Sequence, residues 1–302
     1  MNLLGGARGS NEALVRNLAP VRWRWHGARP AGDDGIVASL TADFSFVGVA
    51  GRRLRLGQWH ARAQAARPLV LLNGIGMNME LMEPVARALP CRRVISFDMP
   101  GIGKSPDPII PYTMPCMALT LAALLDRLHL DVVDVLGISW GGAVAQQFAF
   151  QHRARIGRLA LAATAAGVAM VPGNPAILSH MADPREYTVA RTLQRNLAML
   201  YNGGGRHAVS LNAAMPPSPV GWACQLSAFS TWSSAPFLPL LSVPTLVLHD
   251  EEDQLMPPAN AHFLHGAIPG SRLEMFEGGG HLFMLADPDA FAETLRGFLD
   301  AA

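Results

Sequence analysis

Lysine is nearly absent from this chain of 302 residues: Lys104 is the only one, and arginine supplies the rest of the basic side chains. The 24 basic and 23 acidic residues leave a net charge of +1, so there is no excess positive charge to bind a nucleic acid backbone. Charged residues make up 16% of the chain and hydrophobic residues 50%. A disordered chain is excluded, because such chains have too little apolar surface to bury.

Cysteine is also scarce, since the chain contains only Cys91, Cys116 and Cys224. They are an odd number, lie far apart and form no CxxC pair, whereas zinc sites and disulfide frameworks need closely spaced cysteines. This usage favours core packing in a reducing compartment. We therefore expect a cytoplasmic protein with no metal site.

Long apolar runs are missing as well. The longest, residues 159–171, contains Thr164 and Gly167 and is too short for a bilayer, which needs ~20 apolar residues. Residues 1–32 hold five arginines and one acid, Glu12, but no continuous apolar segment followed by a small-residue cleavage site. The sequence predicts no transmembrane segment and no secretory signal, and residues 1–38 are expected to form a flexible extension.

Short runs rich in β-formers alternate with segments of helical period along most of the chain. Residues 38–60 form two alternating runs that can turn at Ala50-Gly51, which predicts a hairpin. Further strands are expected at 69–73, 93–98, 132–137, 158–163, 244–249 and 271–277, and helices at 117–128, near 258–266 and after Asp287-Pro288. Strands that alternate with helices predict a mostly parallel sheet covered by helices on both faces.

The alternation is interrupted at residues 165–240. This stretch is rich in proline, glycine, methionine and tryptophan, includes Asn202-Gly203-Gly204-Gly205, and contains no convincing buried strand. Because the strand pattern resumes afterwards, we expect one sheet with an inserted cap, or lid. The predicted core is formed by residues 39–164 and 241–302, and the predicted cap by residues 165–240.

The sequence Gly137-Ile138-Ser139-Trp140-Gly141 follows an apolar strand and opens a helix. This strand–turn–helix context is typical of a nucleophile elbow, in which the serine sits in a strained turn and the glycines let strand and helix approach closely. The alternative is an ordinary turn with an incidental serine. Ser139 is therefore the candidate nucleophile, and it needs a base because a serine hydroxyl alone is a weak nucleophile.

His281 is the candidate base, because it follows three glycines between the last strand and the last helix, at the sheet edge where the elbow also lies. His249, His262 and His265 lie on predicted strand or helix positions and are expected to be packed or solvated. An acid must orient the base. Four carboxylates follow the strand at 244–249, and the sequence alone leaves the choice among them open: Asp250, Glu251, Glu252 and Asp253.

Acyl transfer also needs donors for the oxyanion, each worth ~3–4 kcal/mol. One candidate is the backbone N–H of Trp140. The other is assigned to Ile75, with Gly76 as competitor, in a glycine-containing loop that could alternatively be a simple connection. No cofactor is expected, because Asp98 and Pro106 replace the glycines that a P-loop or a dinucleotide fingerprint would need near Gly103.

With these motifs assembled, the chain resembles the α/β-hydrolase superfamily and, within it, the intracellular depolymerases of medium-chain-length poly(3-hydroxyalkanoates). The likeness covers roughly residues 40–300. The motifs that carry it are LNGIGMNMEL at 72–81, FDMPGIGKS at 97–105, GISWGGAVAQQFA at 137–149, LAATAAGVAMVPGNP at 161–175, PTLVLHDEEDQLMP at 244–257 and GHLF at 280–283. The resemblance implies Ser139 as nucleophile, His281 as base and Asp253 as acid.

The resemblance implies a serine ester hydrolase that cleaves poly(3-hydroxyalkanoate) or its oligomers through an acyl-enzyme, with a polymer granule as a place of action. Asn73, Met170, Trp222 and Trp232 are the candidate substrate contacts, although the apolar cap residues among them are equally explained as cap core. One alternative is a small-molecule esterase, thioesterase or carbon–carbon bond hydrolase with the same triad. Another is a non-catalytic relative that binds a ligand. The oligomeric state is not specified by these patterns.

Overall fold

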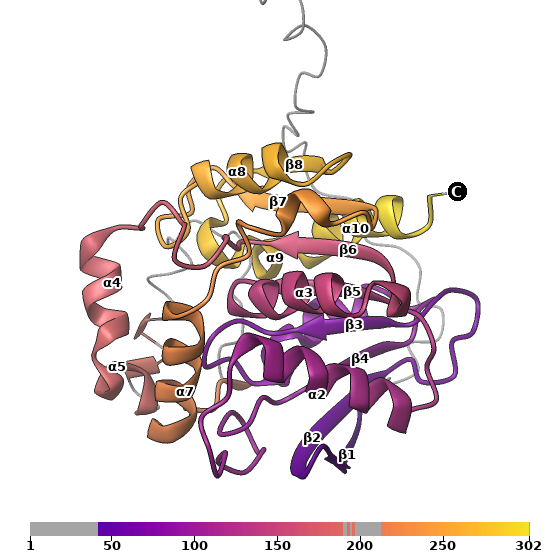
Figure 1. The fold of residues 1–302 in the computed structure, drawn as a ribbon, viewed down its shortest axis with the longest axis horizontal. Helices are drawn as coiled ribbons and strands as arrows, with labels where there is room; N and C mark the ends of the chain where they lie inside the picture. The colour runs from indigo at the N-terminus through magenta and orange to yellow at the C-terminus, as the bar shows by residue number, and fades with distance from the viewer. Residues whose placement is uncertain (1–41, 190–191, 194, 197–212, 302) are drawn as a thin grey trace, which may run out of the picture.

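The computed structural model describes residues 42–189, 192–193, 195–196 and 213–301 (Figure 1). The predicted N-terminal extension and the Asn202–Gly205 segment lie outside these residues. Within the described part, one sheet has the strand order β1-β2-β4-β3-β5-β6-β7-β8. The strands are β1 (Asp43–Val49), β2 (Arg52–Trp59), β3 (Leu69–Leu72), β4 (Val94–Phe97), β5 (Val133–Ile138), β6 (Ile156–Ala162), β7 (Thr245–Asp250) and β8 (Arg272–Phe276).

The first two strands form the predicted hairpin. Ala50 and Gly51 connect them, and both have positive φ (47° and 74°), as a type I′ turn requires. β2 is antiparallel to β1 and to β4, whereas β3 to β8 are all parallel to one another. The prediction of a mostly parallel sheet is therefore confirmed.

Helices cover both faces of this sheet (Figure 1). Side chains along β3 alternate between two cores: Val70 and Leu72 pack with α2, α3 and α8, and Leu69 and Leu71 pack with α1, α9 and α10. The burial of strands on both faces is the reason that they appear in the sequence as continuous apolar runs. The helices that form these two layers are α1 (Glu83–Arg87), α2 (Met114–Arg127), α3 (Trp140–Gln151), α8 (Ala259–Ala267), α9 (Phe283–Ala286) and α10 (Pro288–Leu299).

Helix α10 begins as the sequence predicted. The Asp287 side chain accepts the backbone N–H of Ala290 at 2.9 Å, and Pro288 occupies the first helical position. The predicted inward face is buried and consists of Phe291, Leu295, Phe298 and Leu299. Helix α2 starts three residues earlier than its apolar period indicated, because Thr113 caps it and Pro115 fits its first turn.

Residues 165–240, which the sequence predicts as an insertion between β6 and β7 and which are called the inserted segment below, contain the described helices α4 (Pro175–Ala182), α5 (Pro184–Thr188) and α7 (Pro219–Ser230) and the short 3₁₀ helix η4 (Leu238–Leu240). Figure 1 shows α4, α5 and α7 gathered beside one end of the sheet. The start of α7 packs against the core backbone: Ser218 N–H donates to the Gly101 carbonyl at 2.9 Å, and any side chain on Gly221 would clash with that carbonyl. A glycine is required there for the helix to approach this closely.

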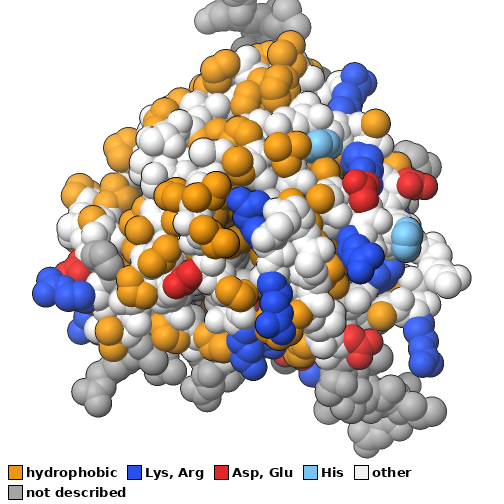
Figure 2. All heavy atoms as spheres, turned by 60° about the horizontal axis from the view of Figure 1, so that its bottom comes forward, with side chains coloured by type: hydrophobic (Ala, Val, Ile, Leu, Met, Phe, Trp, Pro, Cys, Tyr) orange, Lys and Arg blue, Asp and Glu red, His pale blue; other side chains and the backbone are white. Residues whose placement is uncertain are grey.

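The described surface carries several large apolar side chains, including Ile109 (97% exposed) and Ile110 (66%). Figure 2 shows a face on which hydrophobic side chains lie among scattered arginine and lysine side chains and few acidic ones. The expectation of core packing for all three cysteines is wrong for Cys91, which is exposed, and holds for Cys224, which is buried. No helix among the described residues has the length and apolar character needed to cross a membrane.

Candidate active site

Ser139 lies in a strained turn between β5 and α3. Its φ of 53° and ψ of −117° are unfavourable for a residue with a side chain, as the elbow motif predicted. A side chain on Gly141 would clash with the Leu72 carbonyl, and one on Gly137 would lie 2.6 Å from the Ala145 Cβ. The turn is held by Thr164, whose hydroxyl donates to the Ser139 carbonyl at 2.7 Å. The glycines and this hydrogen bond keep the serine at the carboxyl edge of the sheet.

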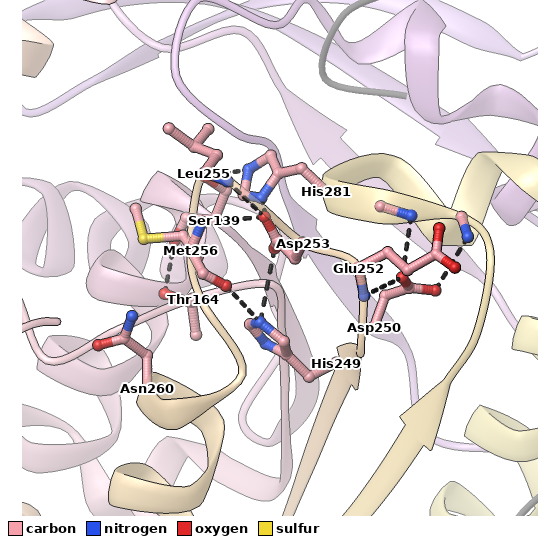
Figure 3. A network of polar contacts seen from close by, with 12 residues as sticks. Ser139, Thr164, His249, Asp250, Glu252, Asp253, Leu255, Met256, Asn260 and His281 are labelled. Carbon is pink, nitrogen blue, oxygen red and sulfur yellow. Dashed lines mark hydrogen bonds and ion pairs between the residues drawn. The ribbon is translucent and has the colours of Figure 1, made fainter. Parts of the chain in front are cut away.

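The structure brings Ser139, His281 and Asp253 into one hydrogen-bonded row (Figure 3). His281 Nε2 lies 3.0 Å from Ser139 Oγ, and His281 Nδ1 lies 2.8 Å from Asp253 Oδ2. A carboxylate can only accept, so Nδ1 carries the proton and Nε2 is free to accept the proton of the serine hydroxyl. All three side chains are buried. The arrangement can activate a serine hydroxyl by general base catalysis.

Geometry now selects one of the four carboxylates that follow β7. Asp253 Oδ2 contacts His281, and Asp253 Oδ1 accepts the backbone N–H groups of Leu255 and Met256, each at 2.9 Å. The Glu251 and Glu252 side chains are exposed. Asp250 points the other way, toward the glycine loop (Figure 3).

Asp250 supports the loop that carries His281. Its two carboxylate oxygens accept the N–H groups of Gly279 and Gly280, both at 3.0 Å, and one of them also accepts the Glu252 N–H. Burial raises the pKa of the Asp250 carboxyl, and these three N–H donors oppose that shift. Sequence reasoning treated Asp250 only as a candidate acid. The structure shows that it ties the end of β7 to the residues before His281.

The loop after β3 distinguishes the two candidate oxyanion donors. Gly76 N–H donates to the side-chain oxygen of Gln225 at 2.7 Å, so it is already occupied. In the described part of the chain, the Ile75 N–H has no such acceptor. Trp140 is the first residue of α3, and the N–H there has no intrahelical acceptor. The geometry therefore favours Ile75 over Gly76 as the partner of Trp140.

A pocket with mainly apolar walls opens beside Ser139 and His281. Its apolar side chains come from the predicted oxyanion loop (residues 73–78, after β3), the short 3₁₀ helix η1 (Met79–Met82), the inserted segment and the loops after β7 and β8: Ile75, Met77, Leu81, Met181, Tyr187, Leu193, Leu255 and Leu282. Such walls suit an apolar acyl chain better than a charged one. No group of three possible metal ligands is found among the described His, Cys, Asp and Glu residues.

Four residues were predicted to contact substrate, and none of them is among the described residues that line this pocket: Asn73, Met170, Trp222 and Trp232. Trp222 stacks on Tyr187 with ring centroids 4.3 Å apart, so it forms a second layer behind the wall. Trp232 donates its indole N–H to Gln147 at 2.6 Å, and Asn73 donates to the Met77 carbonyl at 3.4 Å. Met170 packs against the core. The wall is formed instead by Met181, Tyr187 and Leu193 of the same segment.

His249 lies buried on β7, as a packed strand residue, and the sequence did not predict that it neighbours this row (Figure 3). Its Nε2 lies 2.6 Å from the Met256 carbonyl and 3.5 Å from Asp253 Oδ2. A carbonyl oxygen accepts only, so Nε2 carries the proton. Burial lowers the pKa of His249, and the nearby Asp253 carboxylate opposes that shift. The fold thus favours a neutral imidazole beneath the acid.

This burial predicts an acid sensitivity that a His249→Gln variant should lose. The pKa of His249 is lower in the folded chain, so the unfolded chain takes up its proton first, near pH 6.5, as the pH falls. Stability from this residue is present above that pH and lost below it, by up to about 1.4 kcal/mol per pH unit. The unfolding free energy of wild type relative to His249→Gln, measured in urea from pH 7.5 to 5, should therefore fall.

The matched control for this experiment is His262→Gln, which changes the same residue type at an exposed position of α8. Comparing the two variants separates the effect of protonating the buried His249 ring from the general effect of acid on the stability of the chain. A stability difference between wild type and His249→Gln that stays constant over the pH range would show that the fold does not keep this imidazole neutral.

Comparison with known proteins agrees with this fold. The profile of the alpha/beta hydrolase fold family matches residues 67–288, and the chain belongs to that family. It is 41% identical over 238 residues to a poly(3-hydroxyalkanoate) depolymerase of Ectopseudomonas oleovorans, covering 77% of this chain and 84% of the relative. The chain is therefore an enzyme of the α/β-hydrolase class with a depolymerase among its relatives.

Solved structures show the same architecture. An enol-lactonase from Burkholderia xenovorans LB400 superposes with a TM-score of 0.75 and 26% identity, over 85% of this chain and 100% of that one. An esterase from Exiguobacterium antarcticum gives a TM-score of 0.73 and 25% identity, over 85% of this chain and 99% of that one. Both names describe hydrolysis of an ester linkage, open or cyclic.

Proposed function

We propose that this chain hydrolyses ester bonds of poly(3-hydroxyalkanoate) or its oligomers through an acyl-enzyme on Ser139. The observation that carries the proposal is the row from Ser139 Oγ through His281 to Asp253, at 3.0 and 2.8 Å, beside an apolar pocket. The depolymerase relative supports the substrate class. We further propose that residues 165–240 act as a cap over the site, and that the enzyme works in the cytoplasm on the surface of a polymer granule.

The first half of the reaction forms the acyl-enzyme. Ser139 Oγ attacks the ester carbonyl carbon while His281 Nε2 takes the hydroxyl proton, and Asp253 stabilises the imidazolium that results. The negative charge moves to the carbonyl oxygen, where the Ile75 and Trp140 N–H groups would hold it. The carbon–oxygen bond of the ester then breaks, and His281 gives its proton to the departing alkoxide, which leaves as an alcohol.

The second half releases the acid. A water molecule attacks the acyl carbon while His281 takes one of its protons, and the second tetrahedral species uses the same two N–H donors. Ser139 Oγ then leaves and recovers the proton from His281. The products are a carboxylic acid and an alcohol, which in an ester of 3-hydroxy acids are two parts of the same chain.

A small-molecule esterase with the same groups is the second candidate, and it is favoured by the structural likeness to an esterase and an enol-lactonase. A substrate panel separates the two. Purified enzyme is incubated with emulsified medium-chain polyester, short-chain polyester and soluble aryl esters of increasing acyl length. The proposal expects clearing of the medium-chain emulsion with release of 3-hydroxy acids. Hydrolysis confined to the soluble esters would contradict the polymer assignment.

A further inference from the structure

Gln225 is a buried residue of α7 that contacts both sides of the predicted oxyanion site. Its side-chain oxygen accepts the Gly76 N–H at 2.7 Å, and its backbone carbonyl accepts the Trp140 indole N–H at 2.9 Å. The identity of the side-chain atom follows from chemistry, since a backbone N–H can only donate and must face the amide oxygen. One residue of the inserted segment thus touches two core elements that lie 149 and 85 positions away in the sequence.

The contact to Gly76 matters because it is the short hydrogen bond closest to the Ile75 N–H in the loop after β3. Gly76 has a φ of 68°, a region that only glycine adopts easily, and such a residue can also take other conformations. The other hydrogen bonds of residues 73–77 are longer: Met77 N–H to the Gly74 carbonyl at 3.2 Å, and Asn73 to the Met77 carbonyl at 3.4 Å. Asn78, at the far end of the loop, is held by side-chain bonds of 2.7 to 2.9 Å. The Gln225 bond is the shortest that holds the peptide units next to Ile75.

We infer that Gln225 is a positioning residue: it fixes the Ile75–Gly76 peptide and the Trp140 side chain so that both oxyanion donors face the Ser139 adduct. This inference rests on the proposed acyl-enzyme chemistry. A hydrogen-bond donor stabilises the developing oxyanion only if it lies within a few tenths of an ångström of the correct position. Gln225 acts through Gly76 and Trp140 and does not itself touch the reacting atoms.

The test is a Gln225→Met variant, which keeps the length and volume of the side chain and removes the acceptor oxygen. Removal of a complete oxyanion donor costs about 10²- to 10³-fold in kcat, so displacement of one should cost about 10- to 100-fold. KM for a soluble aryl ester should change less than about 2-fold, because Gln225 itself does not line the pocket and the apolar walls from η1, the inserted segment and the loops after β7 and β8 are unchanged.

Gln147→Met is the matched control. It makes the same substitution in a buried glutamine and removes another hydrogen bond between the core and the inserted segment, the one from Trp232 at 2.6 Å. The hydrogen bond of Gln147 is to Trp232 and does not involve the predicted oxyanion loop. The kcat of the Gln147→Met variant should therefore stay within about 3-fold of wild type. Equal losses of kcat in both variants would mean that Gln225 only stabilises the packing of α7, and would overturn the inference.

Gln225→Glu provides a readout that packing alone would not move. The substitution keeps an acceptor oxygen for Gly76, but once ionised it places a negative charge close to the oxyanion. Its kcat relative to wild type should therefore be highest at low pH and should fall as the pH rises. A ratio independent of pH would contradict a role next to the oxyanion.

Ser139→Ala, measured beside these variants, separates a failure of the proposed acyl-enzyme chemistry from a failure of the proposed role of Gln225. If Ser139→Ala retains hydrolysis, the proposed acyl-enzyme chemistry fails, and the inference fails with it. If Ser139→Ala is inactive while Gln225→Met has the kcat of wild type, the proposed function stands and the role of Gln225 alone is overturned.

Discussion

Replacement of Ser139 by alanine is expected to lower kcat for ester hydrolysis by roughly 10⁴- to 10⁶-fold. The hydroxyl lies 3.0 Å from His281 Nε2, and no acyl-enzyme can form without it. The fold should be retained, since alanine removes one atom and the elbow is held by the Thr164 hydroxyl bond to the residue 139 carbonyl. Initial rates with a soluble aryl ester and the melting temperature of each protein measure both expectations.

Ser179→Ala is the control, because this serine is exposed on α4. Wild type and the control should also react with a fluorophosphonate, which modifies activated serines, and the mass of the intact protein should rise by one adduct. Ser139→Ala should remain unmodified. A fluorophosphonate adduct on Ser139→Ala, or hydrolysis within 10-fold of wild type, would assign the nucleophile to another residue.

Asp253→Asn is expected to lower kcat by about 10³- to 10⁴-fold. The asparagine oxygen can still accept the Leu255 and Met256 N–H groups, so its NH₂ group faces His281. That group donates a hydrogen bond to Nδ1, which places the imidazole proton on Nε2. His281 then cannot accept the serine proton, although the geometry is almost unchanged. The pH dependence of kcat/KM measured with a soluble aryl ester, together with kcat, tests this loss.

Glu251→Gln is the matched control for Asp253→Asn, since it makes the same change of a carboxylate to an amide two residues earlier in the chain. Glu251 is exposed, and its variant should keep kcat within about 2-fold of wild type. A large loss in Glu251→Gln together with a small loss in Asp253→Asn would reassign the acid.

The fold and the strained turn at Ser139 were predictable because each depends on neighbouring residues. The strand before Ser139, the glycines around it and the helix after it are one continuous sequence, and the steric demand of the turn can be deduced from them. The position of His281 followed in the same way from the three glycines and the order of the elements. Strand alternation and the Asp287-Pro288 start of α10 likewise depend on short-range patterns, and the structure confirms them.

The choice of acid and the pocket wall depend on long-range contacts, which no local pattern contains. Four adjacent carboxylates were equivalent in the sequence, but the path of the chain after β7 turns Asp253 toward His281 and Asp250 toward Gly279. The large apolar side chains of the inserted segment carried no local signal of which of them face the pocket. Trp222 and Trp232 instead fill the interior of the inserted segment and its border with the core. Gln225 had no local signal, because its partners lie in distant segments.

The Gly101–Gly221 contact has a consequence for redesign of this enzyme. It seats α7 on the core backbone, and α7 carries Gln225, whereas the pocket wall of the inserted segment comes from the separate stretch with Met181, Tyr187 and Leu193. The two parts meet where Tyr187 of α5 stacks on Trp222 of α7, so acyl preference is better varied at Met181 of α4, which lines the pocket without that contact. Grafting a foreign segment in place of residues 165–240 would replace the pocket wall and Gln225 together, so a change in selectivity would be accompanied by a loss of turnover.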